Sequence, residues 1–139
     1  MKKLLGLAMA VLLFASCSDD NNNEPAVDVS KLTSGKWFRS STRYPDNGQM
    51  YLHDNLCPTS RDYVVFNTDG TITSVYYFED CIFHSDNSGT YTLVGKRLTI
   101  GGSESLIITK LTSSTLVVSG YDMDGDGVSS NSIEFTYTR

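Results

Sequence analysis

The chain has 139 residues, of which 40% are hydrophobic, and its 11 basic and 16 acidic side chains give a formal net charge of −5 at pH 7. This length suits one domain with a modest hydrophobic core. The acidic balance argues against nucleic acid and anionic lipid headgroups as partners, because both repel negative charge.

The N-terminal segment has the residue order of a secretory signal. Lys2 and Lys3 precede an apolar run, Leu4–Phe14, and small residues follow it. The run is shorter than the roughly 20 residues that a helix needs to span a bilayer, so we expect residues 1–16 to be a cleaved signal. Cleavage removes two basic residues and no acidic one, which leaves a net charge of −7.

A polar segment follows Cys17. Residues 18–25 are polar or acidic apart from a final proline, and they cannot bury enough apolar surface to fold. Residues 14–17, Phe-Ala-Ser-Cys, resemble a bacterial lipobox, which implies that Cys17 is lipidated and that residues 17–30 form a tether. More than one acyl chain would make this anchor stable. The alternative is an ordinary secretory signal with a coincidental cysteine.

The location of the anchored protein follows from a second resemblance. Ser18-Asp19-Asp20 resembles the acidic signal that sends lipoproteins of Bacteroidetes-type bacteria to the outer face of the outer membrane. We therefore expect a lipid-anchored outer-membrane protein that is exposed at the cell surface.

From Gly35 onward, short β-branched and aromatic runs alternate with turn residues, which predicts an all-β domain, residues 31–139, of about eight or nine short strands. A helical turn is expected only at Asp28–Ser34, with Asp28 or Ser30 as its cap. The expected strands are Lys36–Tyr44, Gln49–Asn55, Arg61–Asn67, Thr71–Phe78, Thr90–Val94, Arg97–Ile100, Ser105–Leu111, Thr115–Tyr121 and Ser132–Thr138.

Turn chemistry and alternation indicate how these strands connect. Asp69-Gly70 between two apolar runs predicts a tight hairpin, and Asp86–Gly89 predicts another turn. Ile133, Phe135 and Tyr137 share one face of the last strand. One-sided strands in hairpin succession favour an antiparallel up-and-down meander that closes into a barrel.

Two cysteines remain if Cys17 is lipidated. In an oxidising compartment the economical interpretation is a disulfide between Cys57 and Cys81, and closing that loop would stabilise the fold by about 3.5 kcal/mol in the chain-entropy treatment. The alternatives are two buried thiols or a metal pair. Metal is disfavoured because neither cysteine has a second cysteine or a histidine at ligand spacing.

The run Asp122–Gly127 resembles the opening of a calcium loop. Asp122, Asp124 and Asp126 alternate and glycine follows, as hard Ca²⁺ and a tight turn require. However, the position of the bidentate glutamate is taken by Ile133. Two interpretations therefore remain: these three aspartates bind calcium, or the segment is an acidic connection between two strands that binds no metal.

No catalytic residue is predicted. His53 and His84 are the only histidines, and neither forms a metal-binding doublet. No Gly-x-Ser-x-Gly motif is present to expose a serine nucleophile. We expect neither an enzyme nor a cofactor other than calcium.

A family resemblance joins these observations. Gly35-Lys36-Trp37 resembles the Gly-x-Trp signature of lipocalins, which implies that Trp37 closes the barrel base beneath a basic residue, here Arg139. Nearly the whole chain is similar to the lipocalin-like lipoproteins of Bacteroidetes-type bacteria. That similarity is carried by the polar tether and by Leu32–Trp37, Phe66–Gly70, Gly89–Tyr91, Leu98–Ile100 and Tyr137–Arg139.

The resemblance implies a non-catalytic barrel that binds a small hydrophobic or glycan ligand. Strand-end aromatic residues, namely Tyr51, Tyr76 and Phe78, are the expected contacts, because exposed rings stack on such ligands. The alternative is an interaction module whose loops contact another envelope protein. Whether the barrel interior is filled by its own side chains or holds a cavity distinguishes the two.

Overall fold

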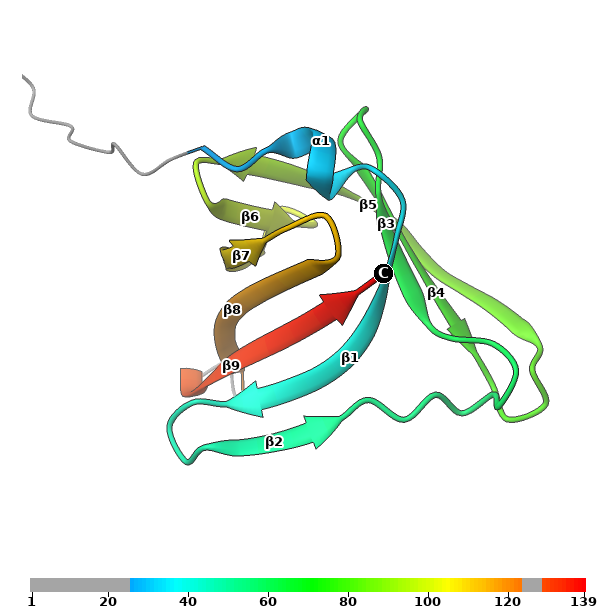
Figure 1. The fold of residues 1–139 in the computed structure, drawn as a ribbon. Coiled ribbons are helices and arrows are strands. Elements are labelled where there is room, and N and C mark those ends of the chain that lie inside the picture. Colours follow the sequence, from blue (N-terminus) through cyan, green and yellow to red (C-terminus); the bar gives the residue numbers. More distant parts are fainter. Residues whose placement is uncertain (1–25, 124–128) are drawn as a thin grey trace, which may run out of the picture.

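The computed structural model describes residues 26–123 and 129–139, and these form a closed antiparallel barrel (Figure 1). Its strands are β1 (Lys36–Tyr44), β2 (Gln49–Leu52), β3 (Tyr63–Phe66), β4 (Thr71–Tyr77), β5 (Phe83–Val94), β6 (Arg97–Ile100), β7 (Glu104–Leu111), β8 (Thr115–Met123) and β9 (Ser129–Thr138), and one short helix, α1 (Val29–Leu32), precedes them. The all-β prediction is confirmed, and β1 and β6 have the predicted bounds.

The barrel closes because β1 pairs with β9 as well as with β3. The remaining strands follow in chain order from β3 to β9, as predicted for an up-and-down meander. Strand β2 is additional: it pairs only with the second half of β1 and lies beside it outside the barrel circuit (Figure 1). Eight strands therefore enclose the interior.

The β3–β4 hairpin forms where Asp69-Gly70 predicted it. Gly70 has a φ of 82°, which glycine adopts without strain, and the Asp69 carboxylate accepts the Thr71 backbone N–H at 3.0 Å. The same aspartate accepts the Thr71 hydroxyl at 2.6 Å. These bonds hold the turn that joins the two strands.

The predicted turn at Asp86–Gly89 is wrong, because these residues lie within β5. The β4–β5 pairing shifts register there: Thr73 faces Ser88 and Ser74 faces Asp86. The extra residue is accommodated as a bulge, which turn-forming residues tolerate. The chain reverses earlier, where Cys81 has a φ of 61° and its N–H bonds the Phe78 carbonyl at 2.8 Å.

The Cys57–Cys81 disulfide is present and confirms the cysteine prediction. It joins the long β2–β3 connection to the β4–β5 turn. The Thr59 hydroxyl lies 3.3 Å from the sulfur of Cys57 and 3.5 Å from that of Cys81. The connection also takes residues from two predicted strands, since β2 ends at Leu52 and β3 begins at Tyr63.

One end of the barrel is closed by α1, Trp37 and Arg139. Asp28 caps the helix by accepting the Ser30 N–H at 3.1 Å, as one of the predicted alternatives had it. Trp37 is fully buried and donates its indole N–H to the Leu32 carbonyl at 2.8 Å. Figure 1 shows the last residue of the chain beside the segment that joins α1 to β1.

Arg139 completes this end. Its guanidinium lies over the Trp37 ring, 3.8 Å from the ring centroid, and donates to the carbonyl of Lys31 at 2.6 Å and to the hydroxyl of Ser34. A further donation reaches the Ser113 carbonyl in the β7–β8 turn at 3.4 Å. One side chain thus ties the helix, the tryptophan and a barrel turn together.

Among the described residues, no helix has both the length and the apolar character that crossing a bilayer requires.

Candidate functional site

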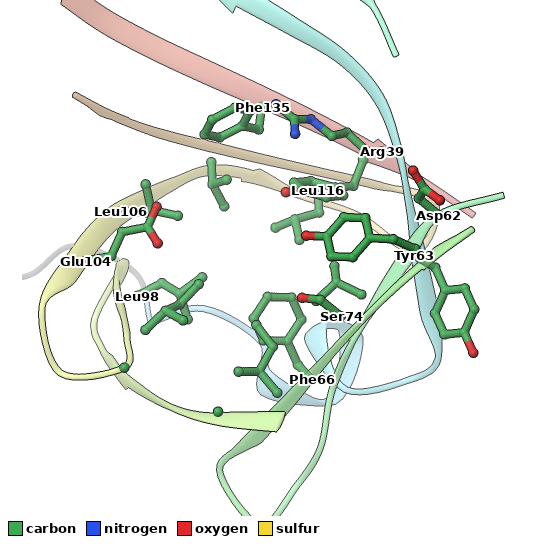
Figure 2. Close-up of a pocket in the computed structure, with 18 of the residues that line it drawn as sticks. Arg39, Asp62, Tyr63, Phe66, Ser74, Leu98, Glu104, Leu106, Leu116 and Phe135 are labelled. Atoms are coloured by element: carbon green, nitrogen blue, oxygen red, sulfur yellow. The ribbon is translucent and has the colours of Figure 1, made fainter. Parts of the chain in front are cut away.

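A cavity of about 540 Å³ lies inside the barrel, within the range of about 300–1,000 Å³ that is usual for small-molecule sites (Figure 2). It is lined by Arg39, His53, Asp62, Tyr63, Val64, Phe66, Ile72, Ser74, Tyr76, Gly89, Leu98, Ile100, Gly101, Glu104, Leu106, Leu116, Val118, Phe135 and Tyr137. The barrel interior is therefore not completely filled by its own side chains.

Most of the wall is aliphatic or aromatic. Phe66, Leu98, Leu106 and Val118 are buried members of the core and come from four different strands. They reach one interior because side chains alternate along a strand, so every second residue of each strand faces inward. This part of the cavity can enclose an apolar group.

A second hollow, of about 660 Å³, lies between the β1–β2 hairpin and β9. Its walls are more polar than those of the first and consist of Arg39, Thr42, Tyr44, Asn47, Gln49, Tyr51, Ile133 and Phe135. Arg39 and Phe135 line both hollows. The apolar cavity inside the barrel thus meets a more polar, open hollow at these two side chains.

Arg39 is the cation of the cavity. Its guanidinium carbon lies 4.5 Å from the centroid of the Phe135 ring, and its Nη2 donates to the Thr42 hydroxyl at 2.9 Å. A register shift in the β1–β9 pairing follows Arg39 immediately, and such bulges re-aim neighbouring side chains. Figure 2 shows the side chain running toward Phe135 along one wall.

Tyr137 lies beside Arg39, since the two are direct partners in the β1–β9 ladder. Burial raises the pKa of its phenol above the ordinary value, while the nearby charge of Arg39 acts in the opposite direction. The phenol therefore stays protonated at neutral pH and can donate a hydrogen bond into the cavity.

His53 and Asp62 are hydrogen-bonded at the cavity wall, with Nε2 and Oδ2 separated by 3.1 Å. Asp62 is buried, and its other oxygen accepts the Tyr77 backbone N–H at 3.0 Å. Asn55 accepts the Asp62 N–H at 2.9 Å. These contacts, together with the disulfide, hold the β2–β3 connection against the end of β4.

The predicted ligand residues fall in three places. Tyr76 lines the apolar cavity, and Tyr51 lines the polar hollow. Phe78 lies just beyond β4, is half exposed, and lines neither. The structure does not gather the three rings into one site.

The predicted calcium loop lies largely outside the described residues. Asp122 pairs with Asn131 at the end of the β8–β9 ladder, whereas Asp124 and Asp126 belong to the undescribed segment. No group of three or more His, Cys, Asp or Glu side chains that could hold a metal occurs among the residues that are described. Calcium at this loop stays a prediction.

Sequence reasoning did not identify Arg39, His53 or Asp62 as cavity residues. A signal existed for Arg39, because alternation from the buried Trp37 places it on the same inward face of β1. His53 and Asp62 lie in a connection without periodicity, and only the folded loop brings them together.

Comparison with known families gives one match. A family model for the lipocalin-like domain matches residues 33–118, from the connection after α1 to the middle of β8. No curated protein and no solved structure gives a significant match to the chain.

Proposed function

Because the chain belongs to the lipocalin-like domain family, we propose that it is a non-catalytic binding protein whose barrel takes up a small hydrophobic molecule. The observation that carries this proposal is the cavity of about 540 Å³ with its wall of core side chains. A solid barrel would have favoured a purely structural role. The apolar wall favours a hydrophobic ligand over a glycan, which would need many hydrogen-bonding partners.

A fluorescence titration with a neutral apolar dye, N-phenyl-1-naphthylamine, tests the proposal on delipidated protein. We expect saturable binding with one site per chain. Ser74→Phe would place a ring in the cavity and should weaken dye binding at least about tenfold. Thr73→Phe is the matched control, since the neighbouring residue on β4 faces away from the cavity. Equal dye binding by both variants would contradict the cavity as the binding site.

The location of the protein is a second part of the proposal. We infer from the residue order around Cys17 that residues 1–16 are removed, that Cys17 is lipidated and that residues 17–30 tether the barrel to the outer membrane. Cys17→Ser should release the protein from the membrane fraction, and mass spectrometry of the wild type should show an acylated N-terminus. A Cys17→Ser protein that stays in the membrane fraction would contradict the lipid anchor.

An interaction role remains the alternative, and exposed apolar side chains favour it. Met50, Tyr51 and Leu52 are all more than half exposed on β2, and Phe78 and Ile82 are at least half exposed at the β4–β5 turn. Exposed apolar side chains such as these are available for contact with a protein partner. Replacing Leu52 and Ile82 with serine should abolish capture of an envelope protein while leaving dye binding intact.

A further inference from the structure

The charge of Arg39 is not balanced by an acid within the described residues. The ion pairs of Lys31 with Asp28 and of Arg43 with Glu134 do not involve Arg39, and Asp62 is bonded to His53. The Nε atom of Arg39 is buried and has no hydrogen-bond partner among the described residues. A buried polar group without a partner is unfavourable, and an unpaired charge is more so.

Two carboxylates also line the cavity, and neither forms an ion pair with Arg39 within the described residues. Asp62 is held by His53 and by the Tyr77 N–H. Glu104 is exposed and lies beside Leu106, across the cavity from Asp62 (Figure 2). No ion pair joins either acid to the Arg39 guanidinium in the part of the chain that the structure describes. The Arg39 guanidinium could therefore form an ion pair with an anionic ligand.

The surroundings of Arg39 set the shape of that anion. The guanidinium lies where the apolar cavity and the polar hollow meet, beside the Tyr137 phenol. Nη2 bonds Thr42 and Nε is buried, so a planar carboxylate in the cavity would accept from the part of the guanidinium that lines it, a pairing that arginine favours. Any chain attached to the carboxylate can extend into the apolar cavity.

We propose that the ligand is an amphiphile with one carboxylate head, held by Arg39 and the Tyr137 hydroxyl, and an apolar tail against Leu98, Leu106 and Val118. This inference rests on the proposed binding function and adds the chemical class of the ligand. The polar hollow, lined by Thr42 and Gln49 among others, gives water access to the head. The cavity and the hollow thereby orient the molecule.

Isothermal titration calorimetry of delipidated protein tests this class, with dodecanoate below its critical micelle concentration and with its methyl ester below its solubility limit. The tails are identical, so the difference in affinity reports the head alone. We expect the wild type to bind dodecanoate at least about tenfold more tightly than the ester. Arg39→Met should remove this preference while retaining the ester affinity, and Arg39→Lys should keep part of it.

Arg97→Met is the matched control, because the Arg97 side chain is exposed and donates to the Ser105 hydroxyl on the barrel exterior. It should keep the full preference for dodecanoate. Equal affinity of the wild type for acid and ester would overturn the inference but leave the binding function standing. Binding of neither ligand, together with no binding of the neutral dye, would overturn both. If Arg39→Met does not fold, the wild-type comparison and Arg39→Lys decide the question.

Discussion

The guanidinium carbon of Arg139 lies 3.8 Å from the centroid of the Trp37 ring, although Trp37 lies in the first strand of the barrel and Arg139 follows the last. The indole N–H is bonded to Leu32 on the other side of this pair. Helix α1 and β1 are thus fixed to the residue that follows β9. The closed end of the barrel is therefore held by contacts between residues that lie far apart in the sequence.

Arg139→Gln should therefore destabilise the fold. The variant loses the cation–π contact and the bonds to the Lys31 carbonyl and Ser34, so we expect a loss of about 1–3 kcal/mol in the free energy of unfolding. Urea denaturation measures it. The control Arg97→Gln should stay within about 0.5 kcal/mol of the wild type, and equal losses in both variants would contradict a special role for Arg139.

Gly120 is a packing requirement of the cavity wall. A β-carbon at this position would lie 2.5 Å from Cδ2 of Leu106, so Gly120→Ala must push that side chain aside. We expect a loss of about 1–3 kcal/mol and weaker dye binding, because Leu106 lines the cavity. Ser119→Ala, one residue earlier in β8, is the control for the alanine itself. An unchanged stability and dye affinity in Gly120→Ala would show that Leu106 moves freely.

The disulfide should contribute to stability. Reduction, or replacement of both Cys57 and Cys81 with alanine, frees the β2–β3 connection from the β4–β5 turn. We expect a loss of about 2–5 kcal/mol, measured by thermal unfolding with and without reductant. The double variant should not respond to reductant. A wild type with the same stability in both conditions would contradict this contribution.

Because the Tyr137 phenol is buried, we expect the free energy of unfolding to decrease at alkaline pH. Burial raises the pKa of its phenol above the ordinary value of 10.0, so the folded chain holds this proton more tightly than the unfolded chain does. The stabilisation is complete below the unfolded pKa and decreases as the pH rises from about 10 toward the folded pKa. Urea unfolding at several alkaline pH values measures it. Tyr137→Phe should decline less steeply over this window than the wild type.

Much of the fold was predictable from local patterns. Alternation placed Ile133, Phe135 and Tyr137 on one face of β9, and turn chemistry placed the hairpin at Asp69-Gly70. The start of β5 was not predictable in the same way. Asp86–Gly89 has the local signature of a turn, but pairing with β4 and a bulge override it.

The candidate site was less predictable, because it depends on contacts between distant strands. Aromatic residues at strand ends were predicted to contact the ligand, but a position at a strand end does not decide which residues face the cavity, and Phe78 does not line it. Arg39 is important because no acid forms an ion pair with it within the described residues. The sequence could not show this, because it gives 16 acidic residues without their positions in space. Asp62 belongs with His53 only after the connection folds.

The pairing of β1 with β9 also has a consequence for the order of assembly. β1 is the first strand made, yet its partner along most of its length is the last. During synthesis its edge stays without that partner until residues 129–139 have emerged, and contacts of such sequence separation form slowly. In the nascent chain the edge of β1 therefore stays unpaired for longer than that of any later barrel strand. An unpaired edge is prone to aggregation, so β1 is where a chaperone would protect the chain most.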